Sequence, residues 1–159
     1  MLTDFPSKKP YNPGGYNAFQ FIPYYNVEAY PMIANSQVLV PLELSPGAAW
    51  LTGYATMETL SYDEAPQRDE AGPYYTLTVS GFVPGDTQGL IDLVHQMQSQ
   101  RFIVLVHDSL GKQRLVGTPR APLDFAAAFG SGKMRADQKG FNITFSGVST
   151  FPSPVYEVV

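Results

Sequence analysis

The segment Gly130-Ser-Gly-Lys133 is one place in this sequence where residue types and spacing suggest chemistry. A phosphate-binding loop cradles phosphates with backbone N–H groups and a lysine, in the pattern Gly-x-x-x-x-Gly-Lys-Ser/Thr. The first glycine of that pattern is Ala127 here, and the final hydroxyl residue is Met134. We therefore expect a loop at this position and no bound nucleotide.

Other residues that commonly carry chemistry also lack the required neighbours. The two histidines, His95 and His107, form no His-x-His or His-Glu-x-x-His pair, so a zinc site is not expected. Ser109, Ser131 and Ser146 lie outside any Gly-x-Ser-x-Gly turn. The chain has no cysteine, which excludes disulfides and thiol nucleophiles. We predict no catalytic residue, no metal ligand and no cofactor, and hence no enzyme.

The densest acidic cluster, within residues 61–73, contains Asp63, Glu64, Asp69 and Glu70. Paired carboxylates could hydrolyse glycosides, but that reaction needs two acids held across a rigid cleft. A calcium loop would need regularly spaced aspartates, which are not present. We interpret residues 61–73 as a long polar loop that faces solvent or a partner, and the four acids as candidate contacts between subunits.

The composition also points to a protein whose surface is partly covered. Charged residues make up 15% of the chain, whereas about a quarter is usual. The chain contains 10 Tyr, 10 Phe and 1 Trp, and aromatic residues are enriched in interfaces. An aromatic β-core explains these residues equally well. The net charge of −4 argues against a protein that wraps DNA, but it permits a surface that DNA slides past.

Hydrophobic periodicity indicates strands with one helix among them. Apolar and polar residues alternate, as in half-buried strands, over 37–44, 74–83 and 139–147. Further strands are expected over 54–62, 101–106 and 112–118, and residues 119–138 are ambiguous. A helix is expected near 87–98, with an apolar stripe and a cap at Asp86 or Thr87. The predicted fold is an antiparallel β-sandwich or barrel with one flanking helix, an extended N-terminal arm and a long loop.

Residues 1–36 are predicted to be an extended arm, and residues 37–159 to be the β domain. Five prolines in the first 31 residues forbid a regular helix, yet aromatic residues recur throughout. Such a segment packs either on its own domain or on a neighbouring subunit. The candidate interface residues are Tyr16, Phe19, Phe21, Tyr24 and Tyr25. No stretch has signal-peptide or membrane-spanning character, so we expect synthesis in the cytosol and no membrane.

Three segments together resemble small structural proteins of tailed phages, and through them the tail tube class. They are Phe19-Gln-Phe-Ile-Pro23, the strand-turn-strand from Arg101 to Thr118, and Gly140-Phe-Asn-Ile-Thr-Phe-Ser-Gly147. The resemblance spans about residues 19–151. It implies a β-sandwich or barrel that assembles with itself into stacked rings, hexameric in this class. DNA would pass through the lumen without specific binding.

The resemblance further implies a location in the virion tail, beside other tail proteins, after assembly in the host cytoplasm. The acidic segment 61–73 would reach the adjacent ring, with Lys112, Arg114 and Arg120 as candidate partners. A neck, tail-completion or distal-tail (baseplate) protein of related fold is an alternative. A carbohydrate-binding module is an alternative of another class, with a platform built from aromatic residues: Trp50, Tyr54, Tyr74 and Tyr75.

Overall fold

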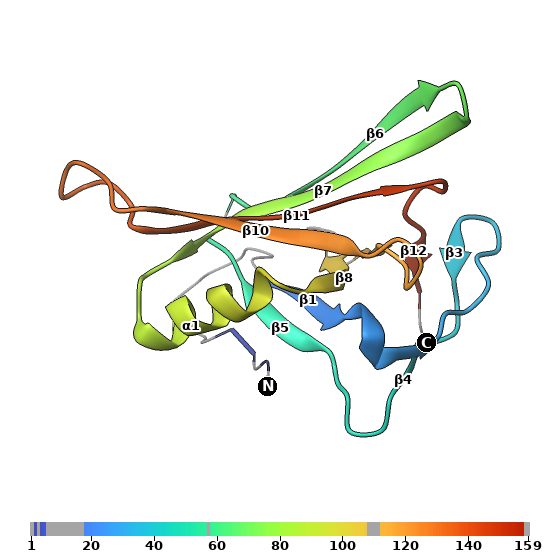
Figure 1. Cartoon of the computed structure of the whole chain (residues 1–159), viewed down its shortest axis with the longest axis horizontal. Helices are drawn as coiled ribbons and strands as arrows, with labels where there is room; N and C mark the ends of the chain where they lie inside the picture. Colours follow the sequence, from blue (N-terminus) through green and yellow to red (C-terminus); the bar gives the residue numbers. More distant parts are fainter. Residues whose placement is uncertain (1, 3, 6–17, 57, 108–111, 158–159) are drawn as a thin grey trace.

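The computed structural model describes residues 2, 4–5, 18–56, 58–107 and 112–157, and these form a mainly β fold with one α-helix. Figure 1 shows the helix beside a large, folded sheet. The strands are β1 Ala18–Pro23, β2 Val27–Ala29, β3 Gln37–Val38, β4 Glu43–Leu44, β5 Leu51–Tyr54, β6 Ser61–Asp69, β7 Gly72–Pro84, β8 Arg101–His107, β9 Gln113–Val116, β10 Leu123–Gly130, β11 Gly140–Ser149 and β12 Val155–Tyr156. The helices are α1 Gln88–Met97 and the 3₁₀ turn η1 Tyr24–Asn26.

The large sheet has the strand order β3-β12-β9-β8-β10-β11-β7-β6, and β1 joins it between β5 and β8. Its pairs are antiparallel except for β12 and β3. β2 and β4 form a separate pair. Among the described residues the path of paired strands does not close into a barrel. The predicted mainly β, antiparallel fold with one flanking helix is confirmed.

The sheet folds over itself where β10 leaves β8, because these two strands pair only at Leu123 and Asp124. Two layers result, and an aromatic cluster fills the space between them. The rings of Phe21 and Phe102 have centroids 5.5 Å apart, and those of Phe102 and Phe145 are 5.9 Å apart, both edge to face. This first core cluster holds the β10–β11–β7–β6 layer against β1 and β8.

Helix α1 closes one end of the first core cluster, as its sequence predicted. Its apolar stripe is buried: Leu90, Leu93, Val94 and Met97. The Thr87 side chain accepts a hydrogen bond from the Leu90 N–H at 3.3 Å, which satisfies one of the free donors of the first turn. The predicted helix and its cap at Thr87 are therefore confirmed.

β8 is buried on both faces, which explains its unbroken apolar sequence. Phe102 and Val104 face the first core cluster, whereas Ile103 and Leu105 belong to a second cluster on the other side of the strand. The second cluster also includes Tyr156 of the short strand β12. A strand covered on both faces has no polar side to show in its sequence.

The N-terminal region differs from the predicted arm. β1 pairs with β5 on one side and with β8 on the other, so residues 18–23 are an interior strand of the sheet. Gly53 is required at this contact, because a Cβ atom there would collide with the ring of Phe19. The predicted domain boundary after residue 36 therefore separates strands that are paired with each other.

The predicted long loop is also different, because residues 61–73 form most of a β-hairpin. β6 pairs with β7 from Ser61 opposite Ser80 to Asp69 opposite Gly72. The hairpin extends away from the body at the upper right of Figure 1. The predicted strand over 54–62 spans the end of β5 and the start of β6, and the strand over 37–44 is split into β3 and β4.

Candidate assembly surfaces

The aromatic interface candidates divide into buried and exposed residues. Phe19 and Phe21 are fully buried in the first core cluster, so they contact their own domain and have no surface for a neighbour. Tyr24 and Tyr25 are 39% and 58% exposed, with ring centroids 5.8 Å apart. They follow β1 directly, in η1. Tyr16 lies outside the described residues.

The acidic candidates lie along one hairpin but do not act alike. Asp63, Asp69 and Glu70 are exposed. Glu64 is turned toward its own chain, where its Oε1 atom accepts a 2.6 Å hydrogen bond from the Ser153 N–H. The Tyr62 hydroxyl lies 2.9 Å from the same Glu64 oxygen. Burial raises the pKa of Tyr62, so this hydroxyl keeps its proton near neutral pH.

The face of the β10–β11–β7–β6 layer that points away from the first core cluster carries small, mainly polar residues across its middle, with Phe82 toward one end and Val148 toward the other. We call it the outer face. Paired residues lie on the same face of a sheet, so the register defines two adjacent rows across all four strands. The first row is Asp124, Ser146, Thr78 and Asp63, and the second is Ala126, Thr144, Ser80 and Ser61.

No residue of these two rows is buried, and none is a lysine or arginine. Ser61 and Ser80 are joined by a hydrogen bond of 2.9 Å between their hydroxyl oxygens. Arg101 of β8 lies at the margin, where its Nε atom is 3.0 Å from the Asp124 carboxylate. The alternation of Asn142, Thr144 and Ser146 in the sequence is the signal of this polar face.

The same layer has an open strand edge on each side. β6 is the last strand of the sheet order, so its outer edge pairs with no described strand. On the other side, β10 pairs with β8 only through Leu123 and Asp124, which leaves the edge of residues 125–130 without a partner strand in the described structure. Open edges carry unpaired backbone donors and acceptors that can bind another strand.

The turn between β10 and β11 contains the Gly-Ser-Gly-Lys segment. The carboxylate of Asp137, in the same turn, lies where a bound anion would accept hydrogen bonds from the backbone. Asp137 Oδ2 accepts hydrogen bonds from the N–H groups of Lys133 and Met134, at 2.8 and 2.9 Å. These bonds hold the pKa of Asp137 below its usual value. The backbone donors that a phosphate would use are therefore already engaged.

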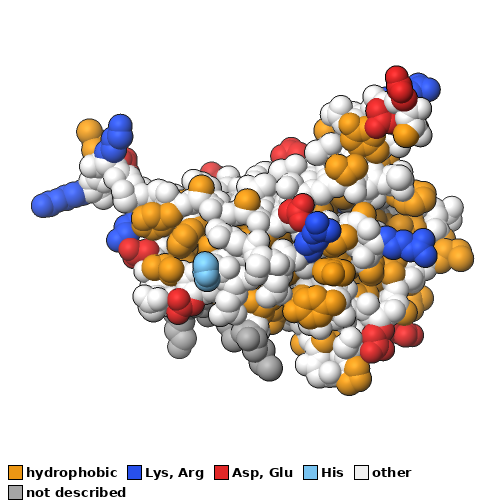
Figure 2. Space-filling model, viewed as in Figure 1, with side chains coloured by type: hydrophobic (Ala, Val, Ile, Leu, Met, Phe, Trp, Pro, Cys, Tyr) orange, Lys and Arg blue, Asp and Glu red, His pale blue; other side chains and the backbone are white. Residues whose placement is uncertain are grey.

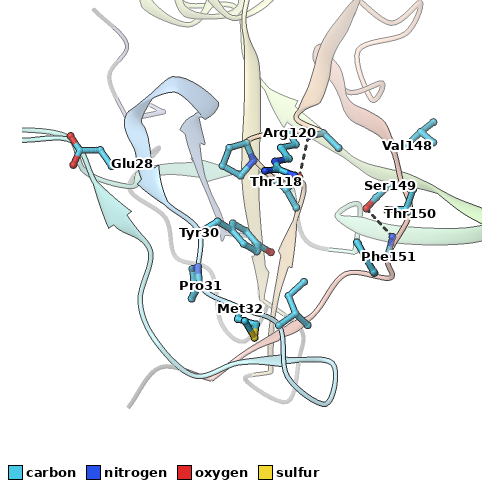
Figure 3. A pocket seen from close by; sticks show the side chains of 13 residues that line it. Glu28, Tyr30, Pro31, Met32, Thr118, Arg120, Val148, Ser149, Thr150 and Phe151 are labelled. Atoms are coloured by element: carbon cyan, nitrogen blue, oxygen red, sulfur yellow. Dashed lines mark hydrogen bonds between the residues drawn. The ribbon is translucent and has the colours of Figure 1, made fainter.

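A groove of about 890 Å³ lies where β11 runs past the end of β10. Figure 3 shows its walls, which include Tyr30 to Met32 on one side and Thr118 to Ala121 and Val148 to Phe151 on the other. The Tyr30 hydroxyl is buried without a hydrogen-bond partner among the described residues. Burial raises the pKa of Tyr30 to about 12. Arg120, one of the predicted partner cations, lines this groove.

The aromatic residues considered as a sugar platform do not form one surface. Trp50 packs against the second core cluster, whereas Tyr75 packs against the first.

Among the described residues, no three His, Asp or Glu side chains are grouped as metal ligands would be. In the same part of the chain, no helix has the length and apolar character to span a membrane. Comparisons of this chain with protein-family models, curated proteins and solved structures found no match.

Proposed function

We propose that this chain is a structural subunit of a phage tail, most specifically a tail tube subunit, which assembles with copies of itself into stacked rings around a DNA channel. The outer face of the β10–β11–β7–β6 layer would line that channel. The observation that carries the proposal is the pair of rows from Asp124 to Asp63 and from Ala126 to Ser61, which present short, mainly polar side chains and no cation.

Such a face suits the passage of DNA. Lysine and arginine side chains bind phosphates and release counterions, so their presence in a channel would hold the polymer in place. The exposed carboxylate of Asp63, at one end of the first row, repels phosphates instead. At the other end the carboxylate of Asp124 is paired with Arg101 of β8, and the two charges partly neutralise each other.

The open edges of the layer support assembly from identical copies. Neighbouring strands in the order β10, β11, β7, β6 are antiparallel, so β10 and β6 run in opposite directions. If β6 of one copy lies beside residues 125–130 of β10 in the next, the antiparallel order continues across the contact. Backbone hydrogen bonds would then join the copies, as in other cases where a strand is added to a sheet edge.

The stagger of the strands is suited to a closed ring. β6 pairs with β7 from Gly72 to Ser80. β10 instead pairs with residues 140–146 of β11, which in turn pair with residues 78–84 of β7. The two open edges are therefore displaced along the strand direction. A sheet can close into a barrel only when its strands are tilted and its register is staggered in this way.

The ring order of six, the neighbouring tail proteins and the place in the virion tail follow from the resemblance of the sequence to tail tube proteins. A neck, tail-completion or distal-tail (baseplate) protein of related fold is the alternative within this proposal. All of these assignments place the chain in a ring at the tail, so one set of experiments addresses them together.

Electron microscopy of the purified full chain tests the proposal, together with light scattering. Rings or tubes support it, and a protein that stays monomeric contradicts it. Because the chain has no cysteine, Thr144→Cys places a single thiol on the outer face. In assembled protein a small maleimide should label it and a large polymer-linked maleimide should not. Asp92→Cys on the exposed side of α1 is the matched control, which both reagents should label.

A further inference from the structure

The two long hairpins of the four-stranded layer end at opposite ends of it. The β6–β7 turn, Asp69 to Gly72, extends beyond the end of β11, because Ser149 already pairs with Tyr75. The β10–β11 turn lies at the other end, where Gly140 pairs with Pro84. Figure 1 shows the two tips projecting from the body in different directions.

The β10–β11 tip presents positive charge. Lys133, Met134 and Arg135 are exposed, with Met134 at 76%. The acid of this tip, Asp137, directs its carboxylate onto the backbone of its own turn. Figure 2 shows basic side chains gathered on the left-hand projection. The outward-facing charge of this tip is therefore basic.

The β6–β7 tip presents mainly negative charge. Asp69 and Glu70 are exposed there, beside the single cation Arg68. The Oδ1 atom of Asp69 accepts a hydrogen bond from the Ala71 N–H at 2.8 Å, which stabilises the turn. Acidic side chains gather on the upper right projection in Figure 2. Asp63, further down β6, adds to the negative charge of the same hairpin.

We propose that stacked rings of this chain are joined by contacts between these tips, with Lys133 and Arg135 of one copy facing Asp69 and Glu70 of a copy in the next ring. This inference rests on the proposed function. In a ring every copy has the same orientation, so all basic tips lie toward one rim and all acidic tips toward the other. Stacking in a constant direction then brings rims of opposite charge together.

These partners differ from the cations predicted from the sequence. Arg114 belongs to β9 and pairs there with Val106 and Val155, and Arg120 lines the groove. Neither lies at the end of the layer opposite to the β6–β7 tip. Single exposed ion pairs contribute little, but a ring forms several of them at once. They are also sensitive to salt, because the screening length is about 10 Å at 0.1 M ionic strength.

A charge-swap experiment tests the contact with the full chain. Lys133→Glu with Arg135→Glu makes the basic tip acidic and leaves Asp137 in place. Gln67→Lys with Glu70→Lys makes the acidic tip basic and keeps the turn hydrogen bond of Asp69. At about 0.1 M salt we expect each double variant to reduce the sedimentable tube fraction on the order of tenfold, through loss of many weak pairs. The combined fourfold variant should restore it.

The control is Asp92→Lys with Gln96→Lys on α1, which alters exposed charge on the helix, leaves the residues of both tips unchanged and should assemble normally. Circular dichroism shows whether every variant is folded. Double variants that stack as well as the unchanged chain, or a fourfold variant that does not stack, overturn the tip contact but leave the ring proposal standing. An unchanged chain that forms no rings overturns both.

Discussion

The carboxylate of Glu64 in β6 accepts a 2.6 Å hydrogen bond from the backbone N–H of Ser153, which lies 89 residues further along the chain. The Tyr62 hydroxyl completes this contact, at 2.6 Å from the Ser153 hydroxyl oxygen. The contact ties the base of the projecting hairpin to the segment before β12. Asp63, the next residue toward the N-terminus, points to the opposite face, because side chains alternate along a strand.

Glu64→Ala should therefore destabilise the fold, although Glu64 was predicted as an interface residue. The change leaves the Ser153 N–H without its acceptor, which costs about 1–3 kcal/mol for a buried donor. Urea unfolding of the full chain measures the loss. Asp63→Ala is the control and should change the free energy of unfolding by only about 0.5 kcal/mol. Equal effects of the two changes would show that the Glu64 contact does not hold the hairpin.

Leu93→Ala should destabilise the fold more strongly. Leu93 lies on the buried stripe of α1 and is 5% exposed. Removing a buried leucine side chain costs about 2–5 kcal/mol. Ile91 is 40% exposed on the same helix, so Ile91→Ala is the matched control and should cost much less. Denaturant unfolding that does not distinguish the two variants would contradict the packing of α1.

Phe21→Ala should cost about 3–5 kcal/mol of stability, as expected for a fully buried aromatic residue. Tyr25 lies two residues beyond the end of β1 and its ring is exposed, so Tyr25→Ala should cost about 1 kcal/mol or less. Removal of residues 1–35 deletes β1 entirely, so we expect that chain to lack a cooperative unfolding transition. A truncated chain that unfolds like the full chain would mean that β1 is dispensable.

Acid should weaken the fold partly through His107. Burial lowers the pKa of His107 from its usual value of 6.5. As the pH falls below about 6.5, the unfolded chain binds a proton that the folded chain does not, so stability decreases. His107→Gln should flatten the part of the stability profile that lies just below pH 6.5, where carboxylates still contribute little. An unchanged slope in chemical unfolding over that range would rule this group out.

The parts of the fold that were predictable carry their signal in local sequence. β7, β11 and α1 each bury one face, so the alternation of residues such as Thr144 and Phe145 or the stripe around Leu93 reveals them. β6 lacks that signal, because most of its side chains are exposed and it contains Pro66. β1 was missed because prolines surround it, and aromatic composition does not distinguish a chain's own core from a neighbouring surface.

The candidate site was predictable only in part. The polar side of β11 was visible in the sequence, but the rows of the outer face depend on which strands lie beside it. The order β10, β11, β7, β6 places Asp124 and Asp63, which are 61 positions apart in the sequence, at the two ends of one row. Open edges and the opposite ends of two hairpins are properties of strand order and stagger. No local pattern in the sequence encodes them.

A reconstruction by electron cryomicroscopy of the assembled full chain tests whether the outer face lines a channel. We expect closed rings in which the row Asp124, Ser146, Thr78 and Asp63 faces a central channel, and β6 of each copy lies beside β10 of the next. A protein that forms no ring would contradict it. So would a ring in which this row faces outward or is covered by another subunit.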